Sequence, residues 1–173
     1  FEVFADEFEE MERQALEIAE WGDNVYVKIP ITNTRQQSAS GLIQRLSSQG
    51  VRLNITAILA LDQVQEVATA VQNGPACIVS VFAGRIADTG VDPIPIMKDA
   101  LAILQSAPNA ELLWASPREV LNIYQADAIG CDIITATNDL LQKLALAGKD
   151  LAEYSLETVR MFYNDAQKAG YEL

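Results

Sequence analysis

The chain has 173 residues and a net charge of −12, with 12 Lys and Arg against 24 Asp and Glu. This charge disfavours nucleic acid or an anionic membrane as a partner, and the lack of histidine excludes Ser-His and Cys-His catalysis and most zinc sites. Half of the residues are apolar, yet no apolar run is long enough to span a bilayer. We therefore expect a soluble protein. The two cysteines fit a reducing cytoplasm better than a disulfide framework.

Short apolar, β-branched runs alternate along the chain with amphipathic stretches of helical period. Strand–helix units in succession predict parallel strands joined by helical crossovers. The predicted strands are residues 2–5, 25–30, 51–58, 76–82, 111–116 and 131–136. The predicted helices are residues 6–21, 34–49, 61–72, 94–105, 117–128 and 138–145, and a last helix that Ser155 caps over 155–168.

Two architectures fit six such units: an open doubly wound sheet and a closed (β/α)8 barrel. No strand is followed by a glycine-rich phosphate loop, which counts against the open sheet. Polar residues that share a strand face, such as Asn54 and Thr56, favour the barrel, because barrel enzymes build their sites at the carboxyl ends of strands. The predicted fold is an α/β TIM (β/α)8 barrel, with six of its eight units in one partial domain over residues 1–173.

Lys28 stands inside the apolar run 25–30. Burying an ammonium group is costly unless it is paired or loses its proton. Desolvation lowers the pKa of a lysine, and a neutral amine can attack a carbonyl to form a Schiff base. The alternative is a lysine at a strand end whose ammonium group reaches solvent. From the strand alone, this alternative is the more common case.

Five short motifs stand in order at predicted strand ends. They are Glu2-Val3, Val27-Lys28-Ile29-Pro30, Asn54-Ile55-Thr56, Ser80-Val81-Phe82-Ala83-Gly84-Arg85 and Ala115-Ser116-Pro117-Arg118. Together they resemble the motifs on strands three to seven of the transaldolase family, in particular its small transaldolase and fructose-6-phosphate aldolase-like members. The resemblance covers the whole chain and begins at the third strand of the family's barrel. The family's first two β/α units have no counterpart in this sequence.

The resemblance implies a class I enzyme that needs no metal or cofactor and acts on sugar phosphates in the pentose phosphate pathway of carbohydrate metabolism. Lys28 would form the Schiff base with a ketose phosphate. Glu2 and Thr56 would hold a catalytic water, and Asn54 and Ser80 would bind hydroxyls of the donor.

The resemblance also implies a phosphate site formed by Arg85, Arg118 and Ser116. A guanidinium group suits this task because its fork gives bidentate, charge-assisted hydrogen bonds. The alternative for both arginines is an ordinary surface salt bridge. Asp62, Asp88 and Asp92 are interpreted as helix caps.

Two other functions remain open. The first is a fructose-6-phosphate aldolase-like lyase, although that branch carries tyrosine where this chain has Phe82, a substrate-binding position. The second is a non-catalytic barrel fragment. The resemblance also places the acid–base aspartate on a strand that this sequence lacks, so we expect the isolated chain to be inactive without a segment that completes its barrel. The C-terminal helical region, residues 151–173, is expected to form homo-oligomer contacts, with Val159, Phe162 and Tyr163 on one face.

Overall fold

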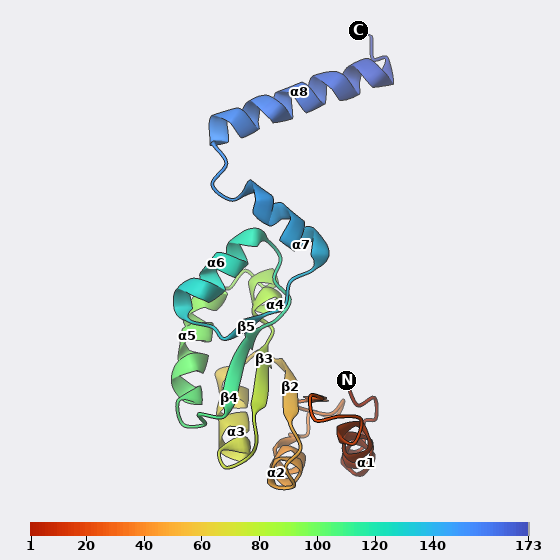
Figure 1. Cartoon of the computed structure of the whole chain (residues 1–173), viewed down its shortest axis with the longest axis vertical. Coiled ribbons are helices and arrows are strands. Elements are labelled where there is room, and N and C mark those ends of the chain that lie inside the picture. The colour runs from red at the N-terminus through yellow and green to blue at the C-terminus, as the bar shows by residue number, and fades with distance from the viewer. Residues whose placement is uncertain (173) are drawn as a thin grey trace. The chain divides into compact units, whose positions relative to one another are not determined.

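The computed structural model describes residues 1–172 and divides the chain into two compact units. The first unit comprises residues 1–137 and the second begins at Asn138. Figure 1 shows the elements of both units. The single domain over residues 1–173 stays a prediction. Among the described residues, no helix is both long and apolar enough to cross a membrane.

A parallel sheet forms the centre of the first unit, as the alternating pattern predicts. Its strands are β1 Val27–Pro30, β2 Leu53–Ile58, β3 Cys77–Val81, β4 Ala110–Trp114 and β5 Ile133–Ile134. They pair in chain order and all pairs are parallel. A doubly wound sheet would reverse its strand order at a switch point. The sequential order is consistent with part of a barrel, and the closed eight-stranded barrel stays a prediction.

The predicted first strand, residues 2–5, is reduced to a short parallel contact with β1. Glu2 and Lys28 form an isolated bridge. The Lys28 N–H donates to the carbonyl of Phe1 at 2.7 Å, and the Val3 N–H donates to the carbonyl of Lys28 at 3.1 Å. This contact brings Glu2 beside Lys28, although the structure assigns no regular strand to these residues.

Six helices accompany the sheet in the first unit. Figure 1 shows them beside the strands, and their bounds are α1 Phe8–Ala19, α2 Ser40–Ser48, α3 Leu61–Val71, α4 Ala83–Asp88, α5 Pro93–Leu104 and α6 Val120–Ile129. The sequence did not predict α4, because six residues that include a glycine show no helical period.

The two faces of the sheet differ in composition. Side chains such as Ile29, Ile55 and Val79 are fully buried in the core that the helices complete. The opposite face carries Lys28 and Asn54 in register. Because successive strand residues point to opposite faces, this alternation places the polar residues together on the face away from the core.

The second unit contains α7 Asn138–Lys143, a 3-10 turn at Leu144–Leu146, and α8 Leu151–Ala169. The predicted start of the last helix at Ser155 is wrong. The Asp150 carboxylate accepts a hydrogen bond from the Glu153 N–H at 2.9 Å and caps α8, five residues before the predicted cap. Aspartate is as good an N-cap as serine, so the residue type alone could not decide between them.

Candidate active site

A cavity of about 270 Å³ opens toward the carboxyl ends of the strands. It brings together most of the residues that the motifs predicted, but Glu2, Arg85 and Arg118 are not part of its lining. The lining residues are Lys28, Asn54, Thr56, Ser80, Phe82, Leu113, Ala115, Ser116 and Thr135. Polar side chains from successive strands that share one cavity are typical of sites in parallel α/β proteins.

Lys28 lies less deeply than its apolar strand predicts. Its side chain is 36% exposed, and its Nζ lies 3.2 Å from Oε2 of Glu2, which is itself half-exposed. Partial solvent access and a carboxylate partner therefore reduce the desolvation cost of placing a lysine in an apolar strand. The same arrangement puts an amine and a proton acceptor side by side at the edge of the cavity.

Asn54 and Thr56 project from β2 into the cavity, opposite Ser80 of β3. The Ser80 hydroxyl donates to Oδ1 of Asn54 at 2.7 Å, which fixes the orientation of the amide. The Thr56 hydroxyl is buried and has no hydrogen-bond partner among the described residues. A buried unpaired hydroxyl costs about 1–3 kcal/mol, so a water or a ligand group is the expected partner.

The backbone beside Thr56 is irregular. Ala57 has a φ of 62°, and the pairing of β2 with β3 shifts register between Ile55 and Ile58. A non-glycine residue in the left-handed region is strained, and bulges of this kind often re-aim side chains next to functional sites. The irregularity lies directly beside the unpaired Thr56 hydroxyl.

The loop after β4 is held against α4 by the glycine of the Ser-x-Phe-x-Gly-Arg motif. Ser116 has a φ of 58°, and its carbonyl oxygen would lie 1.5 Å from a Cβ at position 84. The Gly84 N–H donates to the carbonyl of Ala115 at 3.2 Å. Only glycine permits this approach, which places Ser116 at the cavity.

The two arginines lie just beyond the lining. The Arg85 guanidinium stacks over the Phe82 ring, 5.0 Å from its centre. The Arg118 guanidinium forms a two-point ion pair with Asp88, in which Nε lies 3.1 Å from Oδ1. The interpretation of Asp88 as a helix cap is wrong, because this last residue of α4 binds Arg118. Asp92 does cap a helix, since it accepts a hydrogen bond from the Ile94 N–H at the start of α5.

Thr135 lines the cavity and was not among the predicted site residues. Its backbone N–H donates to the carbonyl of Trp114 at 3.2 Å, which extends the pairing of β5 with β4. It stands near the end of the predicted strand 131–136, in the same kind of position as the other polar residues. This position at a strand end is the sequence signal by which Thr135 could have been predicted as a site residue.

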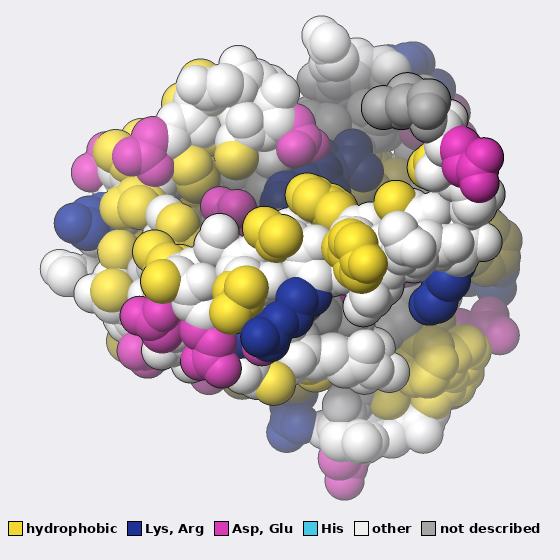
Figure 2. All heavy atoms as spheres, turned by 90° about the horizontal axis from the view of Figure 1, so that it is seen from above, with side chains coloured by type: hydrophobic (Ala, Val, Ile, Leu, Met, Phe, Trp, Pro, Cys, Tyr) yellow, Lys and Arg dark blue, Asp and Glu magenta, His cyan; other side chains and the backbone are white. Residues whose placement is uncertain are grey.

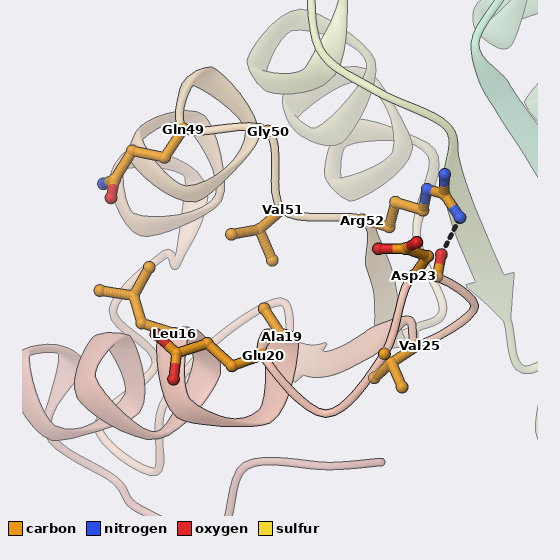
Figure 3. Close-up of a pocket in the computed structure, with 10 residues that line it drawn as sticks. Leu16, Ala19, Glu20, Asp23, Val25, Gln49, Gly50, Val51 and Arg52 are labelled. Carbon is orange, nitrogen blue, oxygen red and sulfur yellow. Dashed lines mark hydrogen bonds between the residues drawn. The ribbon is translucent and has the colours of Figure 1, made fainter.

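A second and larger cavity, of about 450 Å³, lies at the amino-terminal ends of β1 and β2 (Figure 3). Leu16, Ala19 and Val51 supply its apolar wall, and the Arg52 guanidinium donates to the carbonyl oxygen of Asp23. None of the predicted site residues lines it. Sites in proteins with parallel sheets lie at the carboxyl ends of the strands, so the smaller cavity is the better candidate despite its size.

The fold and the cavity define an α/β protein with a lysine and several hydroxyl and amide groups gathered toward the carboxyl ends of parallel strands. Sequence comparison identifies the particular family. The family model described as Transaldolase/Fructose-6-phosphate aldolase matches residues 1–173, and the chain belongs to this family.

Individual relatives agree with this assignment. A "Probable transaldolase" of Brucella anthropi is 32% identical over 173 residues, which cover 99% of this chain and 74% of that protein. A "Probable transaldolase" of Nitrosopumilus maritimus is 31% identical over 145 residues, covering 83% of this chain and 62% of that protein. Among solved structures, a mandelate oxidase variant with an FMN adduct shares the fold at a TM-score of 0.57 and 17% identity, over 97% of this chain and 57% of that one.

Proposed function

We propose that the protein is a transaldolase, which transfers a dihydroxyacetone unit from a ketose phosphate to an aldose phosphate through a Schiff base on Lys28. The observation that carries this proposal is the cavity itself. It gathers Lys28, Asn54, Thr56 and Ser80 in one space, and its amine has a carboxylate partner at 3.2 Å. Membership of the transaldolase and fructose-6-phosphate aldolase family supports the same chemistry.

In the proposed reaction, the Lys28 amine adds to the ketose carbonyl at C2, and loss of water gives a protonated imine. The C3–C4 bond then breaks with its electron pair moving toward the imine, while the C4 hydroxyl loses its proton and C4 leaves as an aldehyde. The enamine that remains attacks the aldehyde carbon of the acceptor through C3. Hydrolysis releases the new ketose and returns the free amine, so one difficult step becomes two easier ones.

Residues around Lys28 would manage water and protons. The unpaired Thr56 hydroxyl and the Glu2 carboxylate are suited to hold a water beside the amine. Asn54, oriented by Ser80, would bind donor hydroxyls. We propose that the main acid–base aspartate and the closure of the barrel come from a further N-terminal segment. The chain spans 74% of the B. anthropi relative and 62% of the N. maritimus relative.

Arg85, Arg118 and Ser116 would bind the phosphate. Ser116 lines the cavity, and each arginine follows a lining residue by two or three positions. Two guanidinium groups would also give this site local positive charge in a chain whose net charge of −12 otherwise repels an anionic substrate. We place the reaction in the cytoplasm, in the pentose phosphate pathway.

The alternative is a fructose-6-phosphate aldolase-like lyase, which the family description also names. Phe82 favours the transaldolase, because a phenyl ring cannot donate or accept a proton as a tyrosine hydroxyl can. Release of free dihydroxyacetone from fructose 6-phosphate in the absence of an acceptor aldehyde would favour the lyase instead.

Borohydride trapping tests the Schiff base. The complete native protein is incubated with fructose 6-phosphate, reduced with borohydride and digested for peptide mass spectrometry. We expect a substrate-derived mass on Lys28 in the wild type and its loss in Lys28→Arg. Lys98→Arg, an exposed change on α5, is the matched control and should label like the wild type. A wild-type protein that gains no mass on Lys28 would refute the mechanism.

A further inference from the structure

We propose that Asp88 is a positioning residue for phosphate recognition: it holds the Arg118 guanidinium with one edge free for the anion. The proposal rests on the proposed function, because it assumes that Arg118 binds the phosphate of the substrate. It adds a role for a residue that does not line the cavity and whose carboxylate could not itself bind a phosphate.

The ion pair leaves some N–H donors of the Arg118 guanidinium without a partner among the described residues, and these donors could bind a phosphate. Asp88 accepts from Nε through Oδ1 and from Nη2 through Oδ2, so it occupies one side of the guanidinium. Arginine has five N–H donors in a planar fork. The two Nη1 donors and the second Nη2 donor remain, and they form another edge with the parallel geometry that phosphate oxygens match. The side chain is 50% exposed, so this edge can be reached from solvent.

The backbone under Arg118 is fixed independently. Oδ1 of the buried Asn122 accepts hydrogen bonds from the N–H groups of Arg118 at 2.7 Å and Glu119 at 3.1 Å. With both its backbone and its guanidinium held, Arg118 loses little rotational freedom when it binds an anion. Groups that are ordered before binding bind more tightly for this reason.

One short helix also connects the two arginines. Arg85 and Asp88 both belong to α4, and Gly84 brings α4 into contact with the loop that carries Ser116. Asp88 thus links the Arg118 guanidinium to α4, the helix that carries Arg85. Because both partners are about half-exposed, this ion pair contributes little to stability, and its expected effect is on phosphate binding.

The charge of Asp88 and its contact with Arg118 predict opposite effects on phosphate binding when Asp88 is replaced, which makes the proposal testable. Asp88 is an anion near a proposed anion site, so neutralising it would strengthen phosphate binding if only net charge mattered. If Asp88 positions Arg118, its loss weakens binding even though the local charge becomes more positive. Asp88→Asn keeps the side-chain size and removes the charge-assisted pair, so it separates the two.

The test measures the dissociation constant of inorganic phosphate by calorimetry on the complete native protein, together with KM and kcat for fructose 6-phosphate and fructose. For Asp88→Asn we expect the phosphate dissociation constant and the KM for fructose 6-phosphate to rise about fivefold. The kcat and the KM for fructose should stay within about twofold. Asp88→Glu, which keeps a carboxylate, should recover part of the loss.

Asp99→Asn makes the same charge change at an exposed position of α5 and should leave every constant unchanged. Unchanged or tighter phosphate binding in Asp88→Asn would overturn the proposal, as would the absence of phosphate binding in the wild type. If Asp88→Asn does not fold, Asp88→Ser is measured in its place, and unchanged or tighter phosphate binding in that variant overturns the proposal. A wild type that binds phosphate but forms no Schiff base would refute the proposed function and leave the role of Asp88 standing.

Discussion

Gly84 shows how the position of one atom determines a loop of the candidate site. A Cβ there would lie 1.5 Å from the carbonyl oxygen of Ser116 and 2.5 Å from its carbonyl carbon. Both are backbone atoms, so no side-chain rotation can relieve the overlap. Ser116 already has a left-handed φ of 58°, which limits how far the loop can move in response.

We expect Gly84→Ala to destabilise the fold by at least about 1–3 kcal/mol, the usual cost of overpacking, and to weaken phosphate binding. Urea unfolding followed by circular dichroism measures the first effect. Gly41→Ala is the control, because its new Cβ would meet only the flexible end of Arg45 at 3.8 Å. That change removes a helical glycine and should stabilise the fold by up to about 1 kcal/mol. Equal stabilities for the two variants would contradict the argument.

At the residue scale, the sequence predicted best where position along a strand decides the outcome. Lys28, Asn54 and Ser80 line the cavity because alternation and motif order place them on one face. Cys77 is buried, and burial raises the pKa of its thiol to about 12. The partner of Asp88 could not be predicted, because Arg118 is 30 residues away and only the packing of α4 brings them together.

At the element scale, the prediction succeeded for long periodic segments and failed at short or capped ones. The five strands of the sheet and the long helices α1, α3 and α5 follow the hydrophobic pattern, whereas the predicted strand over residues 2–5 is only an isolated bridge. The six-residue α4 does not follow the pattern, and α6 begins at Val120 rather than at residue 117. The reason for the late start is local: Asn122 binds the N–H groups of Arg118 and Glu119 and keeps them outside the helix.

An ion pair between α1 and α2 predicts a pH dependence of stability. Oε2 of Glu12 lies 2.7 Å from Nη2 of Arg45, and this hydrogen bond lowers the pKa of the Glu12 carboxyl below its ordinary value of 4.5. A carboxyl whose pKa is lower in the folded state stabilises the fold above its unfolded pKa, and this stabilisation is lost as pH falls through the folded value.

We therefore expect Glu12→Gln to lower the free energy of unfolding at neutral pH by no more than about 1 kcal/mol, since Arg45 is half-exposed. The difference from the wild type should shrink as the pH falls below 4.5. Urea titrations at a series of pH values measure it. Glu9→Gln, an exposed change on the same helix, is the charge-matched control. A difference that stays constant with pH would rule out this pair as its source.

At the scale of the whole molecule, the sequence order of the strands could be predicted and the closure of the barrel could not. The described residues supply a five-stranded sheet, and a TIM barrel has eight strands. The B. anthropi relative aligns with the chain over 74% of its own length. The hydrophobic pattern of these residues therefore cannot predict the strands that would close a barrel.

The last helix provides a separate argument about assembly. α8 has 19 residues and no buried side chain. Val159, Phe162 and Tyr163 are 58%, 62% and 64% exposed, and Figure 2 shows apolar side chains at the surface among charged ones. Most of the stability of a helix in a protein comes from packing of its apolar face, and large exposed apolar side chains that share one face usually mark an interface. We propose that α8 is stabilised by contacts within a homo-oligomer.

Ending the chain after Asp150 tests this proposal, because it removes α8 while leaving the first unit and α7 in place. We expect the truncated protein to elute from size exclusion with light scattering at a lower oligomer mass than the complete protein. Replacing Phe162 and Tyr163 with Ser should produce the same shift, because it removes apolar contact area and leaves the chain length unchanged. Exchanging Asp165→Asn on the same helix should not, since it alters charge alone. An unchanged mass in both the truncated and the doubly substituted protein would show that α8 holds no subunits together, and its apolar residues would then need another partner.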